Sequence, residues 1–223
     1  IAIPKLEEMQ NFEVDNFTSP AYVARLDYRG VPGLRIGGSF YYCVNTASNS
    51  DKVATYAGVR APLRIYTVDG QYKNKYVTAR TNFVFGNLTG ATAISNKNKG
   101  LSNSSPYTRV VQVAKKAVSY AGEVGVNLRS ICNKKVPVIY PFARYEYYNP
   151  QEAGEKGQLP MDKRNQVSMW TAGLNWYALP NLVVKADYMT RQIGTGKVFG
   201  KGKYNSENEF SIGIAYVGWF IKK

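Results

Sequence analysis

The segment Leu182-Val-Val-Lys-Ala-Asp-Tyr188 decides the fold class, because hydrophobic and polar side chains alternate along most of its length. The segments Phe210-Ser-Ile-Gly-Ile-Ala-Tyr216 and Tyr76-Val-Thr-Ala-Arg-Thr-Asn-Phe83 repeat this period of two. In a β-strand, such a period places hydrophobic side chains on one face and polar side chains on the other. The sequence therefore predicts an all-β protein.

Nine segments of this kind follow one another, and we expect each to form a strand. They span about Ala21–Arg29, Leu34–Val44, Leu63–Tyr72, Tyr76–Gly86, Ala117–Leu128, Val136–Tyr148, Val167–Tyr177, from Leu182 up to the connection at 193, and Asn208–Trp219. The connections alternate between short and long, which is typical of outer-membrane barrels with tight turns on one side and large loops on the other. We therefore predict a transmembrane antiparallel β-barrel over residues 20–223, preceded by a loop or leading segment over residues 1–19.

Composition agrees with this prediction and excludes a helical membrane protein. No run of eighteen hydrophobic residues exists, so we expect no transmembrane helix. The chain has 18 Tyr, 9 Phe and 3 Trp, and such aromatic side chains suit the two interfacial girdles of a barrel. Cys43 and Cys132 are expected at opposite ends of the strands, roughly 25 Å apart. A disulfide needs Cα atoms within about 7 Å, so we expect them not to pair.

The number of strands bears on whether the barrel is complete. With nine alternating strands the first and the last run in the same direction, whereas single-chain bacterial barrels are antiparallel throughout and even-stranded. We therefore expect further strands before Ile1, and the alternative is a strand hidden within residues 1–19.

Several segments resemble a known family in both sequence and order. They are Pro20-Ala-Tyr-Val-Ala-Arg-Leu-Asp-Tyr28, Val31-Pro-Gly-Leu-Arg-Ile-Gly37, Tyr120-Ala-Gly-Glu-Val-Gly125, Pro141-Phe-Ala-Arg-Tyr-Glu-Tyr147, Gly173-Leu-Asn-Trp-Tyr177 and Pro180-Asn-Leu-Val-Val-Lys-Ala-Asp-Tyr188. Together they resemble the C-terminal half to two-thirds of the phosphate-selective porin O and P family. The resemblance implies a sixteen-stranded outer-membrane channel of a Gram-negative bacterium, often a homotrimer. Two features depart from the family: the upstream strands are absent, and Ile221-Lys222-Lys223 extends past the terminal aromatic residue.

The polar side of the predicted strands carries charges of both signs, which we expect to line a pore. These candidates are Arg25, Asp27, Arg35, Asp69, Arg80, Glu123, Arg144, Glu146, Lys185 and Asp187. Opposite charges lie two residues apart or on neighbouring strands, as in a cross-strand lattice of ion pairs. Two roles are open: the lattice braces and wets the wall, or its arginines pass anions along the pore.

The excess positive charge lies in the predicted loops, which contributes to a net charge of +14. The anion-attracting candidates are Lys97, Lys99, Arg109, Lys115 and Lys116 in connection 87–116, and Lys197, Lys201 and Lys203 in connection 193–206. A basic loop folded into the pore would concentrate anions at a constriction. A basic loop facing surface polysaccharide is the alternative.

We expect a porin that lets small hydrophilic solutes diffuse passively, with a preference for anions or phosphate; the phosphate preference comes from the resemblance alone. The alternative is a barrel whose loops bind a partner protein or polysaccharide and conduct little. The expected partners are outer-membrane lipid, lipopolysaccharide, small anionic solutes, and further copies or other outer-membrane proteins. Acids among the arginines argue against nucleic acid, which they would repel. A chain without His offers no common catalytic triad, so we expect no enzyme, cofactor or metal.

Overall fold

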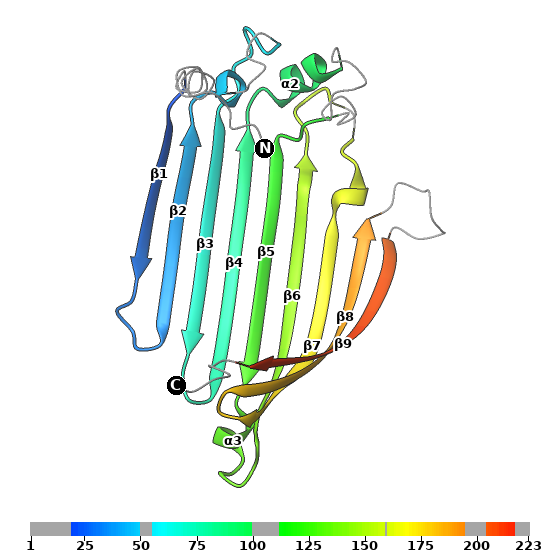
Figure 1. Ribbon diagram of the computed structural model, residues 1–223. Coiled ribbons are helices and arrows are strands. Elements are labelled where there is room, and N and C mark those ends of the chain that lie inside the picture. Colours follow the sequence, from blue (N-terminus) through cyan, green and yellow to red (C-terminus); the bar gives the residue numbers. More distant parts are fainter. Residues whose placement is uncertain (1–18, 50–54, 100–111, 159, 195–203, 217–223) are drawn as a thin grey trace, which may run out of the picture.

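Nine antiparallel strands form a single sheet in the computed structural model, in which every strand pairs with its neighbours in sequence (Figure 1). The structure describes residues 19–49, 55–99, 112–158, 160–194 and 204–216. The strands are β1 (Ala21–Tyr28), β2 (Leu34–Cys43), β3 (Leu63–Lys73), β4 (Val77–Leu88), β5 (Lys116–Val126), β6 (Val138–Ala153), β7 (Val167–Leu179), β8 (Leu182–Gly194) and β9 (Tyr204–Tyr216). The all-β prediction is confirmed.

The shortest connections, β1–β2, β3–β4 and β7–β8, all lie at one end of the sheet, and the longest, β2–β3 and β4–β5, lie at the other (Figure 1). The end with the longer connections carries the helix α2 (Ala91–Asn98) and two 3₁₀ turns, η1 (Thr46–Asn49) and η2 (Lys163–Asn165). The opposite end carries the one-turn helix α3 (Leu128–Ile131). We call these the α2 end and the α3 end. Cys43 ends β2 at the α2 end and Cys132 follows α3, so they lie at opposite ends as predicted and are not joined by a disulfide.

The tight turns at the α3 end follow from residues suited to them. Gly33 has φ +79°, a conformation that costs little without a side chain, and a Cβ there would lie 2.1 Å from the main-chain oxygen of Lys73. Asn74 makes the β3–β4 turn, because its Oδ1 accepts hydrogen bonds from the main-chain N–H groups of Tyr76 (2.8 Å) and Val77 (2.7 Å). These turns fix the register of the hairpins.

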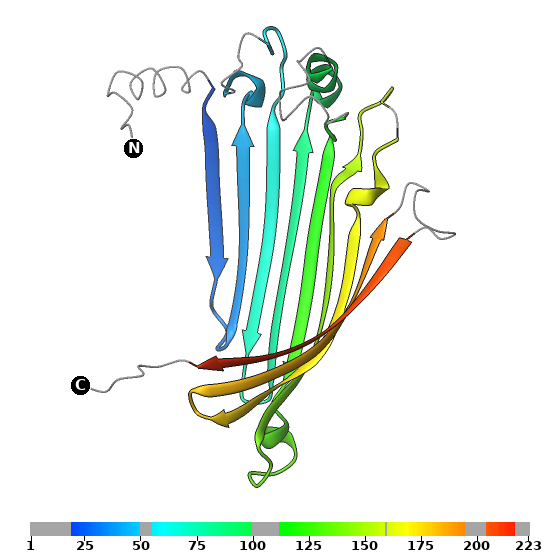
Figure 2. The ribbon, with the colours of Figure 1, turned by 45° about the vertical axis from the view of Figure 1, so that its right-hand side comes forward.

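The sheet is open and strongly curved rather than closed among the described residues. β1 and β9 have neighbours on one side only, and β7 to β9 bend away from the plane of the earlier strands (Figure 2). Eight successive antiparallel pairings make β1 and β9 run in the same direction. The antiparallel sheet agrees with the predicted strand arrangement, and no closed barrel is observed in the part of the chain that the structure describes.

Several strands differ in length from the sequence prediction. β6 continues to Ala153, beyond the predicted end at Tyr148, and β8 continues to Gly194, two residues into the connection predicted over 193–206. β9 begins at Tyr204, before the predicted start at Asn208. The connection that was expected over 149–166 therefore begins within a strand. Residues 1–18 and 217–223, with the C-terminal Ile-Lys-Lys, lie outside the described residues.

Candidate functional site

The strand register brings the ten predicted pore-lining residues onto one face of the sheet. Residues opposite each other in neighbouring strands share a face, so side chains form rows across the sheet. One row contains Asp27, Gly37, Asp69 and Asn82 and reaches Glu146 through Ala121. Alternation places the rest on the same side, which we call the polar face: Arg25, Arg35, Arg80, Glu123, Arg144, Lys185 and Asp187.

Four charges on β1 to β3 form a network on the polar face. Arg25 Nη2 lies 2.7 Å from Asp27 Oδ1 and 2.8 Å from Asp69 Oδ1. Asp69 Oδ2 in turn accepts a hydrogen bond from Arg35 Nη2 at 3.1 Å. The Asp69 carboxylate on β3 thus links the guanidinium groups of Arg25 on β1 and Arg35 on β2. This part of the predicted cross-strand lattice is present.

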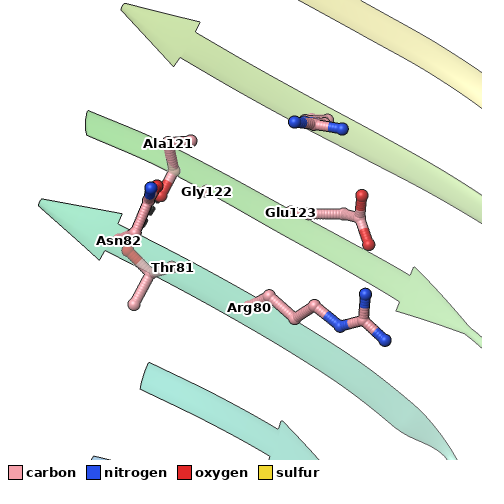
Figure 3. Close-up of a pocket in the computed structure, with 7 residues that line it drawn as sticks. Arg80, Thr81, Asn82, Ala121, Gly122 and Glu123 are labelled. Atoms are coloured by element: carbon pink, nitrogen blue, oxygen red, sulfur yellow. Dashed lines mark hydrogen bonds between the residues drawn. The ribbon is translucent and has the colours of Figure 1, made fainter. Parts of the chain in front are cut away.

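A second charged row crosses β4 to β6. Arg80, Glu123 and Arg144 face one another in the register, so the carboxylate stands between two arginines. They line a hollow of about 220 Å³, and Figure 3 shows Arg80 and Glu123 extending side by side from neighbouring strands. Arg144 pairs with Glu146 at 2.5 Å, whereas no ion pair within 4.0 Å joins Arg80 or Glu123 to a described residue. The Arg80 guanidinium therefore has no ion-pair partner within 4.0 Å among the described residues.

Sequence reasoning missed charges at the α2 end of β8 and β9. Arg191 pairs with Glu207 on the polar face, and Glu209 follows in the next row. The prediction selected only Lys185 and Asp187 on strand eight, and it started strand nine at about Asn208, after Glu207. Predicted Lys185 and Asp187 lie closer to the α3 end of β8, and neither makes an ion pair within 4.0 Å to a described residue. Counted along the strands, the polar face carries nearly balanced charge.

The opposite face, which we call the apolar face, is hydrophobic and uncovered. Large side chains stay exposed even on central strands, for example Val68 at 51% and Trp170 at 59%. The buried hydrophobic residues among those described are few and small: Cys43, Ala47, Val59, Ala61, Ala91 and Val167. A sheet in water would bury one face in a core, and monomeric soluble proteins rarely leave so large a hydrophobic surface exposed.

The hydrophobic band of the apolar face runs diagonally through the register. On β1 it extends from Tyr22 to Tyr28, and Tyr28 shares its row with Asn208 of β9. On β9 the band begins at Phe210, past Asn208, and ends at Tyr216, eight residues beyond Asn208. Both borders of the band therefore shift by eight residues toward the α3 end between β1 and β9.

Helix α2 carries two of the predicted loop cations over the α2 end. Lys97 lies in its last turn and Lys99 follows it, both exposed. Ile94 of α2 contacts a small cluster with Leu88 and Ala61, and Leu88 is on the polar face because it pairs with Leu63. α2 therefore sits toward the polar side of the sheet.

Hydrogen bonds from other connections hold α2 in place. Glu155, which follows β6, accepts from the main-chain N–H groups of Gly90 (2.8 Å) and Thr92 (2.9 Å) at the start of the helix. Burial of Glu155 opposes its ionisation, but the hydrogen bonds from Thr92 and Gly90 outweigh it and lower the pKa of this carboxyl. Tyr56 donates to Asn98 Oδ1 at 2.6 Å near the other end. The helix is thus attached at both ends.

The remaining loop cations do not form one group. Lys115 lies just before β5, and Lys116, expected in a loop, starts β5. Lys116 pairs with Asn87, which places it on the apolar face. The predicted cations Arg109, Lys197, Lys201 and Lys203 lie outside the described residues.

Comparisons with known proteins give no assignment. No protein-family model matches the chain, and no curated protein matches it. None of the helices in the described residues has the length and hydrophobicity needed to cross a membrane. No group of three potential metal ligands occurs in that same part of the chain.

Proposed function

We propose that this chain belongs to an outer-membrane β-barrel channel through which small hydrophilic solutes diffuse passively, with a modest preference for anions. The observation that carries the proposal is the division of the sheet into an exposed hydrophobic face and a charged face. A barrel in lipid needs this division, with its hydrophobic side chains toward the acyl chains and its polar side chains toward a water-filled lumen. The resemblance to the phosphate-selective porin O and P family agrees with it.

The diagonal hydrophobic band supports a tilted barrel. Eight residues along a strand span about 27 Å, and eight steps between strands span about 38 Å. A lipid layer would follow this diagonal if the strands tilted by about 35°, which lies within the range for outer-membrane barrels. Twist in a soluble sheet gives no reason for the hydrophobic band to shift in this way.

Closure of the barrel requires strands that pair with the free edges of β1 and β9. These two strands run in the same direction and cannot close an antiparallel barrel by pairing with each other. We infer that an odd number of further strands joins the two edges. The family that the chain resembles, with sixteen strands, would supply seven.

The anion preference has two modest sources, which are Arg80 on the wall and the α2 end. Charges on the polar face nearly cancel, so the wall itself keeps water in the lumen and favours neither sign strongly. Lys97 and Lys99 add positive charge on a helix that Ile94 and Glu155 hold toward the lumen side. Positive charge at a narrow entrance raises the local concentration of anions.

Conductance across a planar bilayer tests this function. The full-length protein should give stable conductance steps, and a salt gradient should give a reversal potential that favours anions over cations. Absence of conductance from protein that has inserted into the bilayer would contradict a channel. It would favour the second function, a barrel that binds a partner or polysaccharide through its loops.

A further inference from the structure

Two cations break the pattern of the apolar face. Among the described residues that strand pairing places on this face, Arg64 and Lys116 alone carry a charge. Both occupy one row at the α2 end: Arg64 of β3 pairs with Asn87 of β4, and Asn87 pairs with Lys116 of β5. Their Cα atoms are therefore two strand spacings apart, about 10 Å.

The side chains around them change from polar to hydrophobic within one row. Tyr42 continues the row of Arg64, and the Arg64 guanidinium lies 5.6 Å from the centre of its ring. One row closer to the α3 end, Phe40, Tyr66 and Phe85 form a line of rings. Their centroids are 5.0 Å apart for Phe40 and Tyr66, and 6.4 Å apart for Tyr66 and Phe85. Polar groups thus border a hydrophobic surface directly.

The described residues supply no counter-charge to this pair of cations. No described ion pair includes Arg64 or Lys116, and no acidic residue lies on the described apolar face. A cation at the edge of a hydrophobic surface favours a position where its charged group meets a polar layer. An anion that itself carries hydrocarbon chains satisfies both needs at once.

We propose that Arg64 and Lys116 bind the phosphate of an anionic membrane lipid in the leaflet at the α2 end, with Asn87 between them as a hydrogen-bond donor. The acyl chains of that lipid lie along Phe40, Tyr66 and Phe85. This site rests on the proposed function, because it requires the apolar face to meet lipid. The Arg64 guanidinium lies beside Tyr42, on the far side from Lys116. Arginine and lysine side chains are long and flexible enough that one headgroup phosphate above Asn87 would contact both.

Binding of phosphatidylglycerol to the full-length protein in micelles of a neutral detergent tests the site, with tryptophan emission or native mass spectrometry as the readout. Arg64→Gln and Lys116→Gln should each weaken binding about 5-fold, and the double variant about 25-fold, because each cation near an anionic lipid headgroup contributes a comparable amount. Arg64→Lys should retain most of the affinity. The matched control, Lys134→Gln with Lys135→Gln, removes two charges from the α3 end and should leave the affinity unchanged.

Three outcomes would overturn the site while leaving the channel intact. In the first, the double variant binds the lipid as tightly as the wild type does. In the second, the control variant loses as much lipid affinity as the double variant. In the third, inorganic phosphate at the same concentration displaces the lipid. The last would mean that the cations bind free phosphate. A protein that conducts in bilayers but shows one of these outcomes remains a channel without this site. A protein that stays folded and monomeric in buffer without detergent would overturn both proposals.

Discussion

The polar and apolar faces are made by the same nine strands, yet their side chains differ in how far the protein itself provides contacts for them. On the polar face, Asp69 holds Arg25 and Arg35, and Arg144 holds Glu146, so the protein provides most counter-charges itself. On the apolar face, residues such as Val68 and Trp170 stay exposed, and no described part of the chain packs over them. The difference teaches that the described sheet buries only a few small hydrophobic side chains and leaves most of its apolar face exposed.

The largest expected effect comes from placing a charge on the apolar face. Ala186 lies within the hydrophobic band of β8, between Leu174 and Ile212 in its row. Ala186→Arg should lower the free energy of unfolding by about 2–4 kcal/mol, the cost of an arginine at the middle of a bilayer. Urea unfolding in lipid vesicles measures this.

The matched control puts the same charge on the other face. Ser211 neighbours Asp187 on the polar face, so Ser211→Arg should change the free energy of unfolding little. Equal costs for the two variants would remove the distinction between the faces.

The attachment of α2 on the polar side has a smaller expected effect. Glu155→Gln removes the charge that accepts from Gly90 and Thr92, and should lower the free energy of local opening by about 1 kcal/mol. Amide hydrogen exchange at Thr92 measures it, with Lys156→Gln as the control. Because the pKa of Glu155 is lowered in the folded protein, this contribution is present above the ordinary pKa of a glutamate. It is lost as the pH falls through the lowered value, and loss near neutral pH would contradict the assignment.

Charge on the polar face should alter ion selectivity without altering stability much. Arg80→Gln should lower the anion-to-cation permeability ratio about twofold, because a unit charge about 10 Å from the ion path contributes ~0.4 kcal/mol in water before salt screening. Reversal potentials in a salt gradient measure the ratio. Arg64→Gln, on the apolar face, is the control and should leave it unchanged. A larger change for Arg64→Gln than for Arg80→Gln would mean that the polar and apolar faces are assigned the wrong way round.

The smallest effect concerns where α2 lies. Lys97→Glu with Lys99→Glu should lower the same anion-to-cation permeability ratio if α2 borders the lumen. The change per residue should be smaller than for Arg80→Gln, because both lysine side chains are exposed and salt screens their charges. An unchanged reversal potential would place α2 outside the ion path. The double variant Lys134→Glu with Lys135→Glu at the α3 end serves as the comparison.

Sequence reasoning recovered the strands only where they cross the hydrophobic band. Inside the band, neighbouring residues differ strongly in hydrophobicity, and the register places the ten predicted charged residues of β1 to β6 and β8 on one face, as expected. Beyond the band both faces are polar, as at Thr190 and Gln192 of β8, and the alternation disappears although the strand continues. For this reason Arg191 and Glu207, which lie outside the band, were missed.

Helix α2 could not be predicted from its own residues. Its sequence, Ala91 to Asn98, is rich in Thr, Ser and Asn, which are weak helix formers. The helix depends on contacts with distant segments, in which Glu155 binds its first turn and Tyr56 binds Asn98. Such contacts have no signal in the local sequence.

Contact between the apolar face and lipid is tested most directly by quenching of Trp170 and Trp176 with brominated lipids. These residues lie near the two borders of the band on β7 and are 59% and 43% exposed. In vesicles of the Trp219→Phe variant, whose residues 1–223 keep only these two tryptophans, bromine near the headgroup should quench emission strongly and bromine at the bilayer centre less. Emission quenched by aqueous iodide and untouched by bromine at any depth would contradict the account.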